Sequence, residues 1–63
     1  MSIEFDKLSL GEQVRMKRTA ERKSQRQLAA DLKITQSYLS LYELGRLTMT
    51  AEHKAVLQDY LNA

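Results

Sequence analysis

The sequence predicts a compact all-α fold of four short helices, and three observations support this prediction. The 63 residues include no proline and only two glycines, so few positions interrupt a helix. Side chains that start helices recur at short intervals, and apolar residues recur three and four positions apart. We place helices at residues 10–21, 25–32, 36–44 and 51–62. They form one domain over residues 10–63, after an N-terminal arm at residues 1–9.

Each expected helix begins with a hydroxyl side chain, which can accept a hydrogen bond from a free backbone amide of the first turn. Glu12 and Gln27 stand three positions after two of these hydroxyls, which is the spacing of a capping box. Gly45 follows the third helix, where a residue in the left-handed conformation commonly ends one. The helix-start residues are Ser9, Ser24, Thr35 and either Thr48 or Thr50.

The apolar residues of each expected helix fall on one face. None of the helices is long enough to be stable alone in water, so burial of these faces against one another must hold the domain together. The faces consist of Leu10 and Val14 in the first helix, Leu28, Ala29 and Leu32 in the second, Leu39 and Tyr42 in the third, and Val56, Leu57, Tyr60 and Leu61 in the fourth.

The composition argues against several classes of protein. Cysteine is absent and His53 is the only histidine, so we expect neither a disulfide nor a metal site and assign His53 a structural or exposed position. No apolar run approaches the ~18 residues that a membrane span needs. So short a chain has little room for the deep pocket of an enzyme. We therefore expect a cytoplasmic protein with no enzymatic activity, cofactor, membrane association or small-molecule substrate.

Charge is unevenly distributed along the chain, although the formal net charge is only +2. Residues 13–33 carry an excess of basic residues, whereas the segments on either side are slightly negative. Such a block is typical of a surface that binds a polyanion, and a solvated helix face has the same composition. The basic residues of the block are Arg15, Lys17, Arg18, Arg22, Lys23, Arg26 and Lys33, against the acidic Glu21 and Asp31.

Residues 24–46 predict two short helices that cross steeply around a tight connection at Lys33-Ile34, the geometry of a helix-turn-helix. Ala29 is expected where the two helices approach most closely, and Ile34 is expected to fill the gap between them. This packing leaves a face whose N-terminal half is polar and carries short side chains. Such a face can enter the major groove of DNA, which is ~12 Å wide. The residues of this outer face are Gln36, Ser37, Ser40, Leu41 and Leu44.

Three motifs stand in this stretch, namely Ser24-Gln25-x-x-Leu28-Ala29, Thr35-Gln36-Ser37-Tyr38-Leu39-Ser40 and Tyr42-Glu43-x-Gly45-Arg46. With them the sequence resembles the phage repressor and Cro type of helix-turn-helix domain, also called the xenobiotic-response-element family. The resemblance extends back to Val14-Arg15 and Arg18 and, more weakly, forward to Val56 and Leu57, so it covers most of residues 10–61. It implies a lambda-repressor-like domain of four or five helices in a nucleoid-associated protein of a prokaryote or phage-infected host.

The resemblance further implies a partly buried ion pair between Arg18 and Glu43, which ties the first helix to the recognition helix. Two departures from the family pattern stand out. The family often has glycine where Lys33 stands and glycine-leucine where Arg22-Lys23 stand. Lys33 therefore needs either a left-handed backbone, at some cost in strain, or a different turn. The charged pair Arg22-Lys23 stands where the family usually has a helix stop and an apolar contact. The path of the chain after the first helix can therefore differ from that of the family.

We assign the reading of base edges to the third helix, and first to Gln36, because its amide can bond adenine N6 and N7 together. Ser37 and Ser40 contact bases or phosphates, or only fill the surface. Leu41 packs on a thymine methyl group or on a second subunit. We assign phosphate contacts to Gln25, Arg26, Tyr38 and Arg46, and for Tyr38 the alternative is core packing.

These features predict a sequence-specific regulator of transcription that binds double-stranded DNA, most like a small Cro-type repressor. One helix-turn-helix unit buries only ~600–1,000 Å² on DNA, so we expect a homodimer on a palindromic operator. The dimer contacts are expected from Val56, Tyr60 and Leu61, or from the arm through Ile3 and Phe5. The alternative for the arm is a segment folded back over the helices.

Two other functions fit the same scaffold. A protein-binding adaptor, of the antirepressor or antitoxin kind, is favoured by three leucines near the end of the third helix, Leu41, Leu44 and Leu47. A controller protein of a restriction-modification system has the same pattern of helices. Binding to DNA at low salt separates the adaptor from the other two.

Overall fold

The computed structural model describes residues 8–63 as four α-helices. They are α1 (Leu10–Ala20), α2 (Gln25–Leu32), α3 (Gln36–Leu44) and α4 (Ala51–Asn62), and residues 8–63 contain no strand. The all-α prediction is therefore confirmed, and the expected helix bounds hold except that α1 ends one residue early, with Glu21 as its C-cap. Ile3 and Phe5, expected in the arm, lie outside the described residues.

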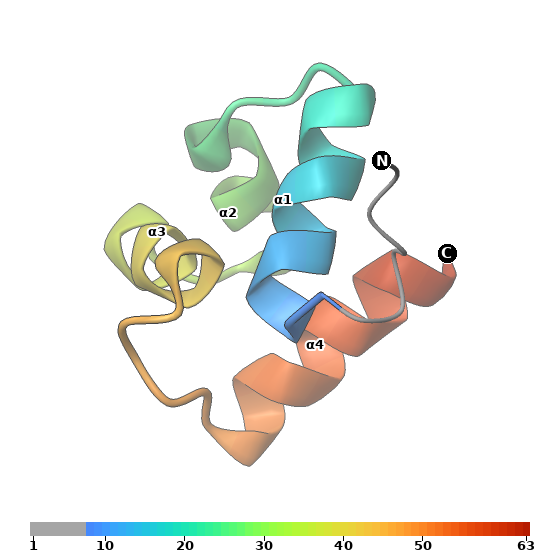
Figure 1. Cartoon of the computed structure of the whole chain (residues 1–63). Coiled ribbons are helices and arrows are strands. Elements are labelled where there is room, and N and C mark those ends of the chain that lie inside the picture. The colour runs from blue at the N-terminus through green and yellow to red at the C-terminus, as the bar shows by residue number, and fades with distance from the viewer. Residues whose placement is uncertain (1–7) are drawn as a thin grey trace.

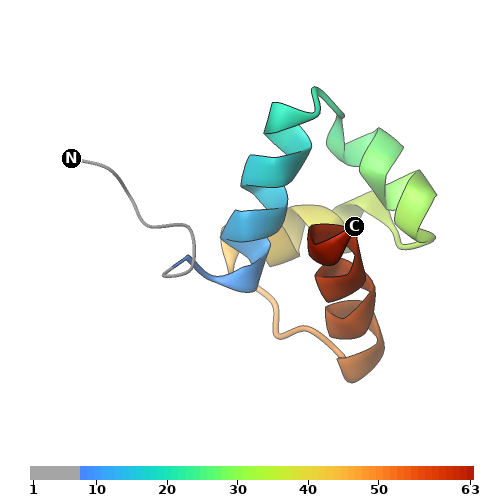
Figure 2. The same cartoon turned by 90° about the vertical axis from the view of Figure 1, so that its right-hand side faces the viewer.

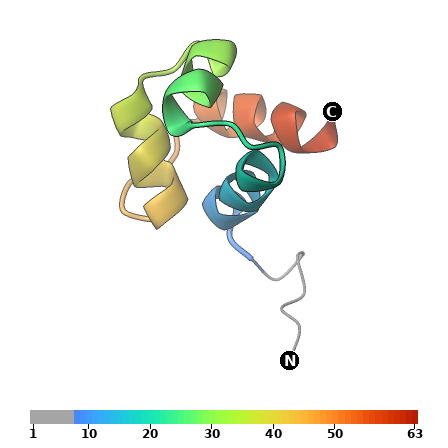
Figure 3. The same cartoon turned by 90° about the horizontal axis from the view of Figure 1, so that it is seen from above.

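The four helices enclose a single core, and α1 lies next to both α3 and α4 (Figure 1). α1 packs against both α3 and α4, and α2 packs against α3. A view turned by 90° shows α3 passing behind α1, with α4 toward the viewer (Figure 2). Seen from above, α1 is viewed nearly end-on and α2 and α3 form a corner beside it (Figure 3). The α2–α3 corner therefore has one side against the core and one side facing outward.

The helix starts follow the predicted caps. Ser24 completes a capping box, because its Oγ accepts from the Gln27 amide at 3.0 Å and its own amide donates to Gln27 Oε1 at 2.9 Å. Thr35 and Thr50 cap α3 and α4, so Thr50 rather than Thr48 starts the last helix. Ser9 caps α1 but forms no complete box, since its hydroxyl donates to the Glu12 carboxylate.

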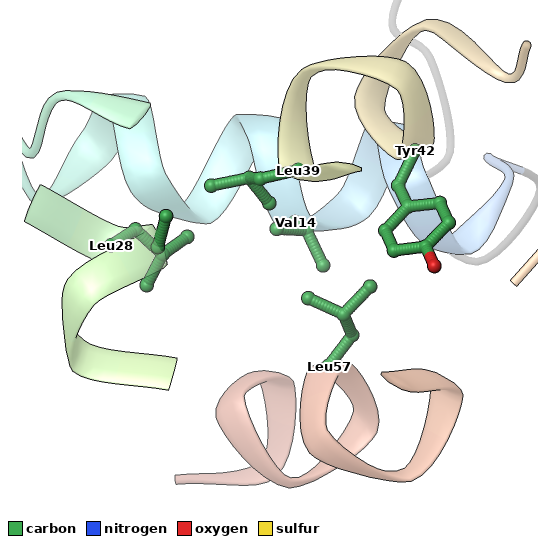
Figure 4. Close-up of a cluster of buried hydrophobic side chains, with 6 residues drawn as sticks. Val14, Leu28, Leu39, Tyr42 and Leu57 are labelled. Carbon is green, nitrogen blue, oxygen red and sulfur yellow. The ribbon is translucent and has the colours of Figure 1, made fainter. Parts of the chain in front are cut away.

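The core takes side chains from all four helices (Figure 4). Four aliphatic side chains are fully buried, and the ring of Tyr42 closes the cluster on the α3 side. Full burial of one such side chain contributes about 1.5–3 kcal/mol, so this small set supplies much of the stability. The buried hydrophobic residues are Val14, Leu28, Ala29, Leu39, Tyr42 and Leu57.

The turn between α2 and α3 is built as the sequence predicts at Ala29 and Ile34. Ala29 is almost fully buried, and the Ile34 amide donates to the Ala29 carbonyl at 3.0 Å. The Ile34 side chain packs partly buried against the core. These two contacts hold α2 and α3 in a fixed crossing, which sets the outward face of α3.

Lys33 and Arg22 both adopt the left-handed backbone conformation, each with φ of 59°. These are the two positions where the resembled family often has glycine. The turn geometry is thus kept and the residues carry the strain, about 1–2 kcal/mol at each non-glycine position. At the Lys33 turn and at the exit from α1, a non-glycine residue thus adopts the left-handed backbone conformation.

Replacing Lys33 or Arg22 by glycine is expected to stabilise the fold by about 0.5–1 kcal/mol each. The relieved strain of about 1–2 kcal/mol exceeds the extra entropy that glycine loses on folding, about 0.5–1 kcal/mol. Urea unfolding followed by circular dichroism measures the effect. Ala30→Gly, at an exposed position inside α2, is the control and should lose about 1 kcal/mol. A loss of stability in Lys33→Gly equal to that of the control would contradict the strain argument.

Candidate nucleic-acid interface

The outward face of α3 lines an open hollow between α2 and α3, with a volume of about 430 Å³. The structure brings together at this hollow all the side chains to which the sequence assigns base contacts, and adds one of those assigned to phosphate. The lining residues are Gln25, Gln36, Ser37, Ser40 and Leu41. The turn at Lys33-Ile34 is what places the first residue of α2 beside the first turn of α3.

The residues of this hollow differ in exposure. Gln36 and Ser37 are exposed at the start of α3, while Ser40 and Leu41 are half-buried further along the helix. Leu41 is thus less exposed than the sequence suggested, and it lines the hollow together with Gln25 of α2. Leu44 is the more exposed leucine of α3, with 57% of its surface accessible. The N-terminal end of α3 therefore presents accessible polar groups, and its C-terminal end presents an accessible leucine.

Arg18 and Glu43 form a two-point ion pair behind the hollow. Arg18 Nε donates to Glu43 Oε2 at 2.8 Å and Nη2 donates to Oε1 at 3.0 Å. The hydrogen bond to Glu43 raises the pKa of Arg18, against the lowering effect of burial. The third guanidinium nitrogen, Nη1, donates to the Lys23 carbonyl at 2.8 Å. The pair implied by the resemblance therefore links α1, α3 and the α1–α2 loop.

Gln25 belongs to the same network, which the sequence did not indicate. Its Nε2 donates to Glu43 Oε1 at 3.1 Å, so the amide is oriented by the ion pair before any ligand arrives. Glu43 is only 4% exposed and is the only charged residue of α3. Because this carboxylate is buried and neutralised, the outer face of α3 presents no net negative charge.

The basic block divides into internal and free charges. Lys17 donates to the Tyr60 and Ala63 carbonyls at 2.6 and 3.1 Å, and Lys23 forms ion pairs with Glu21 at 3.7 Å and Asp31 at 3.4 Å. Other basic side chains are exposed and form no ion pair with any of residues 8–63. They are Arg15, Arg22, Arg26 and Lys33 in the block, and Arg46 and Lys54 outside it. Arg26 and Arg46, both assigned to phosphate, belong to this free group.

Tyr38 is 45% exposed, and one side of its ring is packed. It stacks on Tyr42 with ring centroids 6.2 Å apart and lies 5.7 Å from the ring of His53. Tyr38 is thus packed on one side, as the core alternative requires, and accessible on the other, as a phosphate contact requires. His53, predicted to be structural or exposed, is half-buried and shares a 2.6 Å hydrogen bond with the Tyr42 hydroxyl.

The α4 residues expected at a dimer contact are all half-buried within the chain, namely Val56, Tyr60 and Leu61. The Tyr60 hydroxyl donates to the Glu21 carboxylate at 2.6 Å. Burial and this carboxylate raise the pKa of Tyr60, and the same hydrogen bond lowers the pKa of Glu21. The Tyr60 hydroxyl is therefore bound to the C-cap residue of α1. Leu61 lines a second hollow between α1 and α4, together with Leu10.

Within residues 8–63, no group of three or more histidine, aspartate and glutamate side chains is arranged to hold a metal ion. None of the helices in that range has the length and apolarity needed to cross a membrane.

The comparison with protein families agrees with this architecture. A family model described as a helix-turn-helix domain matches residues 9–63, which include all four helices and the corner formed by α2 and α3. Comparisons with curated proteins and with solved structures gave no match. Helix-turn-helix domains are typical of DNA-binding regulators rather than enzymes. The chain belongs to the helix-turn-helix domain family.

Proposed function

We propose that this protein is a sequence-specific regulator of transcription, a Cro-like repressor that inserts α3 into the major groove of a palindromic operator as a homodimer. The observation that carries the proposal is the hollow lined by Gln25, Gln36, Ser37, Ser40 and Leu41. Its amides and hydroxyls are exposed or half-buried at the start of a helix that presents no free negative charge. A cytoplasmic location in a prokaryotic cell or phage-infected host follows from this function.

The chemistry of the hollow suits the edges of base pairs. The Gln36 amide can donate to adenine N7 and accept from N6 together, and each such pair contributes ~1–3 kcal/mol of discrimination. The hydroxyls of Ser37 and Ser40 can donate or accept, so they fit several bases. Leu41 offers an apolar surface to a thymine methyl group. A short stretch of α3 can thus distinguish adjacent base pairs.

Side chains around the hollow can hold the DNA backbone. Gln25 stands at the N-terminus of α2, where free amides and the helix dipole favour a phosphate. Arg26 and Arg46 are exposed and form no ion pair within the described part of the chain. Tyr38 is accessible at the first turn of α3. These contacts would set the position of α3 without reading the sequence.

A homodimer would increase the area that the protein buries on DNA. One unit buries ~600–1,000 Å² on DNA, which gives weak discrimination against a genome of competing sites. Two units on a palindrome with half-sites one helical turn apart double the number of base contacts. Within residues 8–63, Val56 and Leu61 are the better candidates for the dimer contact, because Tyr60 is held by Glu21.

A protein-binding adaptor is the second candidate, and it has its own observation. Leu44 and Leu47 are 57% and 38% exposed at the end of α3 and in the loop after it. Exposed apolar side chains that lie near each other are typical of protein contacts. In this alternative the scaffold binds a protein through these leucines. A controller of a restriction-modification system would instead use the same DNA face as the repressor.

A mobility-shift series would test the DNA-binding proposal. The protein is titrated against random duplexes and against duplexes selected from a random pool, at 50 to 300 mM salt. We expect binding that weakens steeply with salt and a selected site with two-fold symmetry. Footprinting of the selected duplex gives the half-site spacing and hence the stoichiometry. Absence of binding to every duplex at the lowest salt would refute the proposal and favour the adaptor.

Gln36→Ala and Arg46→Ala are expected to weaken binding in different ways. Gln36→Ala should reduce preference at one or two operator base pairs by about 5- to 100-fold, because a base contact is lost. Arg46→Ala should weaken every duplex alike and reduce the salt slope by about 1, because a phosphate contact is lost. Fluorescence anisotropy with single-base operator variants measures both effects. An equal loss on all duplexes for Gln36→Ala would contradict its reading role.

A further inference from the structure

Three aromatic rings join the recognition helix to the start of α4. Tyr38 and Tyr42 belong to α3, and His53 is the third residue of α4. Each pair of rings has centroids 5.6–6.2 Å apart, within the range of stabilising aromatic contacts. The Tyr42 hydroxyl and His53 Nδ1 share a 2.6 Å hydrogen bond in the same cluster. The three side chains therefore form one triangular contact.

This cluster links α3 and α4 directly, in addition to the core contact that Leu57 of α4 makes. Within residues 8–63 the closely packed helix pairs are α1 with α3, α1 with α4 and α2 with α3. α4 thus reaches α3 mainly through side chains rather than by close packing of the two backbones. Tyr42 is only 2% exposed, so its ring is held in the core and cannot move to follow its neighbours.

The positions of Tyr38 and His53 are fixed at the backbone as well. Each is the third residue of its helix, and each donates its amide to the capping threonine, Thr35 Oγ1 at 3.3 Å and Thr50 Oγ1 at 3.1 Å. His53 is further held at its ring by Tyr42. Among residues 8–63, the Tyr38 ring has no such polar partner, and its aromatic neighbours are His53 and Tyr42.

We propose that His53 is a positioning residue for DNA binding, which holds the Tyr38 ring so that Tyr38 meets the DNA backbone without loss of rotamer freedom on binding. This inference rests on the proposed DNA-binding function and on the phosphate contact assigned to Tyr38. A side chain that is ordered before binding avoids the entropic loss of ordering it in the complex, which corresponds to about two- to tenfold in affinity. An α4 residue thus contributes to affinity through a residue of the recognition helix, without touching DNA.

A double-mutant cycle for DNA affinity tests the proposal with the full chain. His53→Ala should weaken binding to the selected operator about three- to tenfold, since it removes an aromatic contact and an ordering constraint. Tyr38→Ala should weaken binding by at least as much. When His53→Ala is added to Tyr38→Ala, no further loss is expected, because the effect of His53 passes through the Tyr38 ring. Additive losses would overturn the proposal, as would an unchanged affinity in either single variant.

Two further variants separate positioning from a loss of stability. The double variant Tyr42→Phe/His53→Phe keeps three rings and removes both polar partners together, so it should bind within twofold of the wild type. Leu28→Val weakens the core from α2, at the end of the buried cluster away from Tyr42 (Figure 4), and its affinity should be unchanged at an equal loss of stability. An equal loss of affinity in Leu28→Val, or a loss in the double variant as large as in His53→Ala, would overturn the proposal.

The outcomes also separate this inference from the function on which it depends. If the wild type binds no duplex at low salt, both the proposed function and the positioning role are wrong. If the wild type binds a selected operator and the cycle is additive, DNA binding stands and only the role of His53 is wrong.

Discussion

Arg18→Met is expected to remove about 3–5 kcal/mol from the free energy of unfolding, a large part of the total stability at 25 °C. The substitution removes the partner of the Glu43 carboxylate, whose side chain is only 2% exposed. A buried charge left without its partner costs about 3–5 kcal/mol. A chain of 63 residues has a total stability of about 3–9 kcal/mol, so this loss is comparable with the whole. Circular dichroism and urea unfolding measure the folded fraction and the free energy of unfolding.

Two variants show whether the loss comes from the unpaired charge. The double variant Arg18→Met/Glu43→Leu removes both charges, and should recover to within about 2 kcal/mol of the wild type, because apolar side chains can replace a buried ion pair. Lys23→Met removes the exposed ion pairs with Glu21 and Asp31, and should change stability by less than about 1 kcal/mol. If Arg18→Met lost no more stability than Lys23→Met, the ion pair would not be a main support of the fold.

Gly11→Ala is expected to destabilise this protein strongly, and more than the same change at its other glycine. Gly11 lies on α1 where α1 meets α3, and an added Cβ would overlap the Tyr42 carbonyl oxygen and lie 2.8 Å from its carbonyl carbon. Both atoms belong to the backbone of α3, so no side-chain movement can relieve the clash. The helices must separate, with a loss of about 3 kcal/mol or more. Thermal unfolding measures the effect.

Gly45→Ala is the matched control, because the second glycine is needed for a different reason. Gly45 has φ of +69° and ends α3 in the left-handed conformation, and no atom lies within 4 Å of an added Cβ. Alanine there bears only the conformational strain, about 1–2 kcal/mol. If Gly11→Ala and Gly45→Ala lost the same stability, the close approach of α1 and α3 would not be the reason for Gly11.

The helices were predictable because their signals are local. Ser24, Thr35 and Thr50 act on amides three residues away, so their effect can be seen in the sequence without knowledge of the fold. The left-handed turn at Lys33 could be foreseen only as one of two alternatives. A lysine does not prefer that conformation, and the packing of Ala29 and Ile34 decides the outcome.

The candidate DNA face was predictable in its composition but less so in its geometry. The spacing of Gln36, Ser37 and Ser40 placed them on one side of a helix, and the structure has them around one hollow. The bond from Gln25 to Glu43 could not be foreseen, because it joins residues 18 positions apart on different helices. The partial burial of Leu41 depends on the crossing of α2 and α3, which periodicity within one helix does not describe.

The amino-acid order alone determined that the chain forms four capped helices, that they meet through apolar faces, and that a polar helix start is available to face DNA. These properties depend on neighbours within about four residues. Only the tertiary structure decided that Gly11 must lack a side chain, that Gln25 joins the Arg18–Glu43 pair, and that His53 meets Tyr42 and Tyr38. Contacts of this kind depend on distances and angles between helices, and the core as a whole sets those.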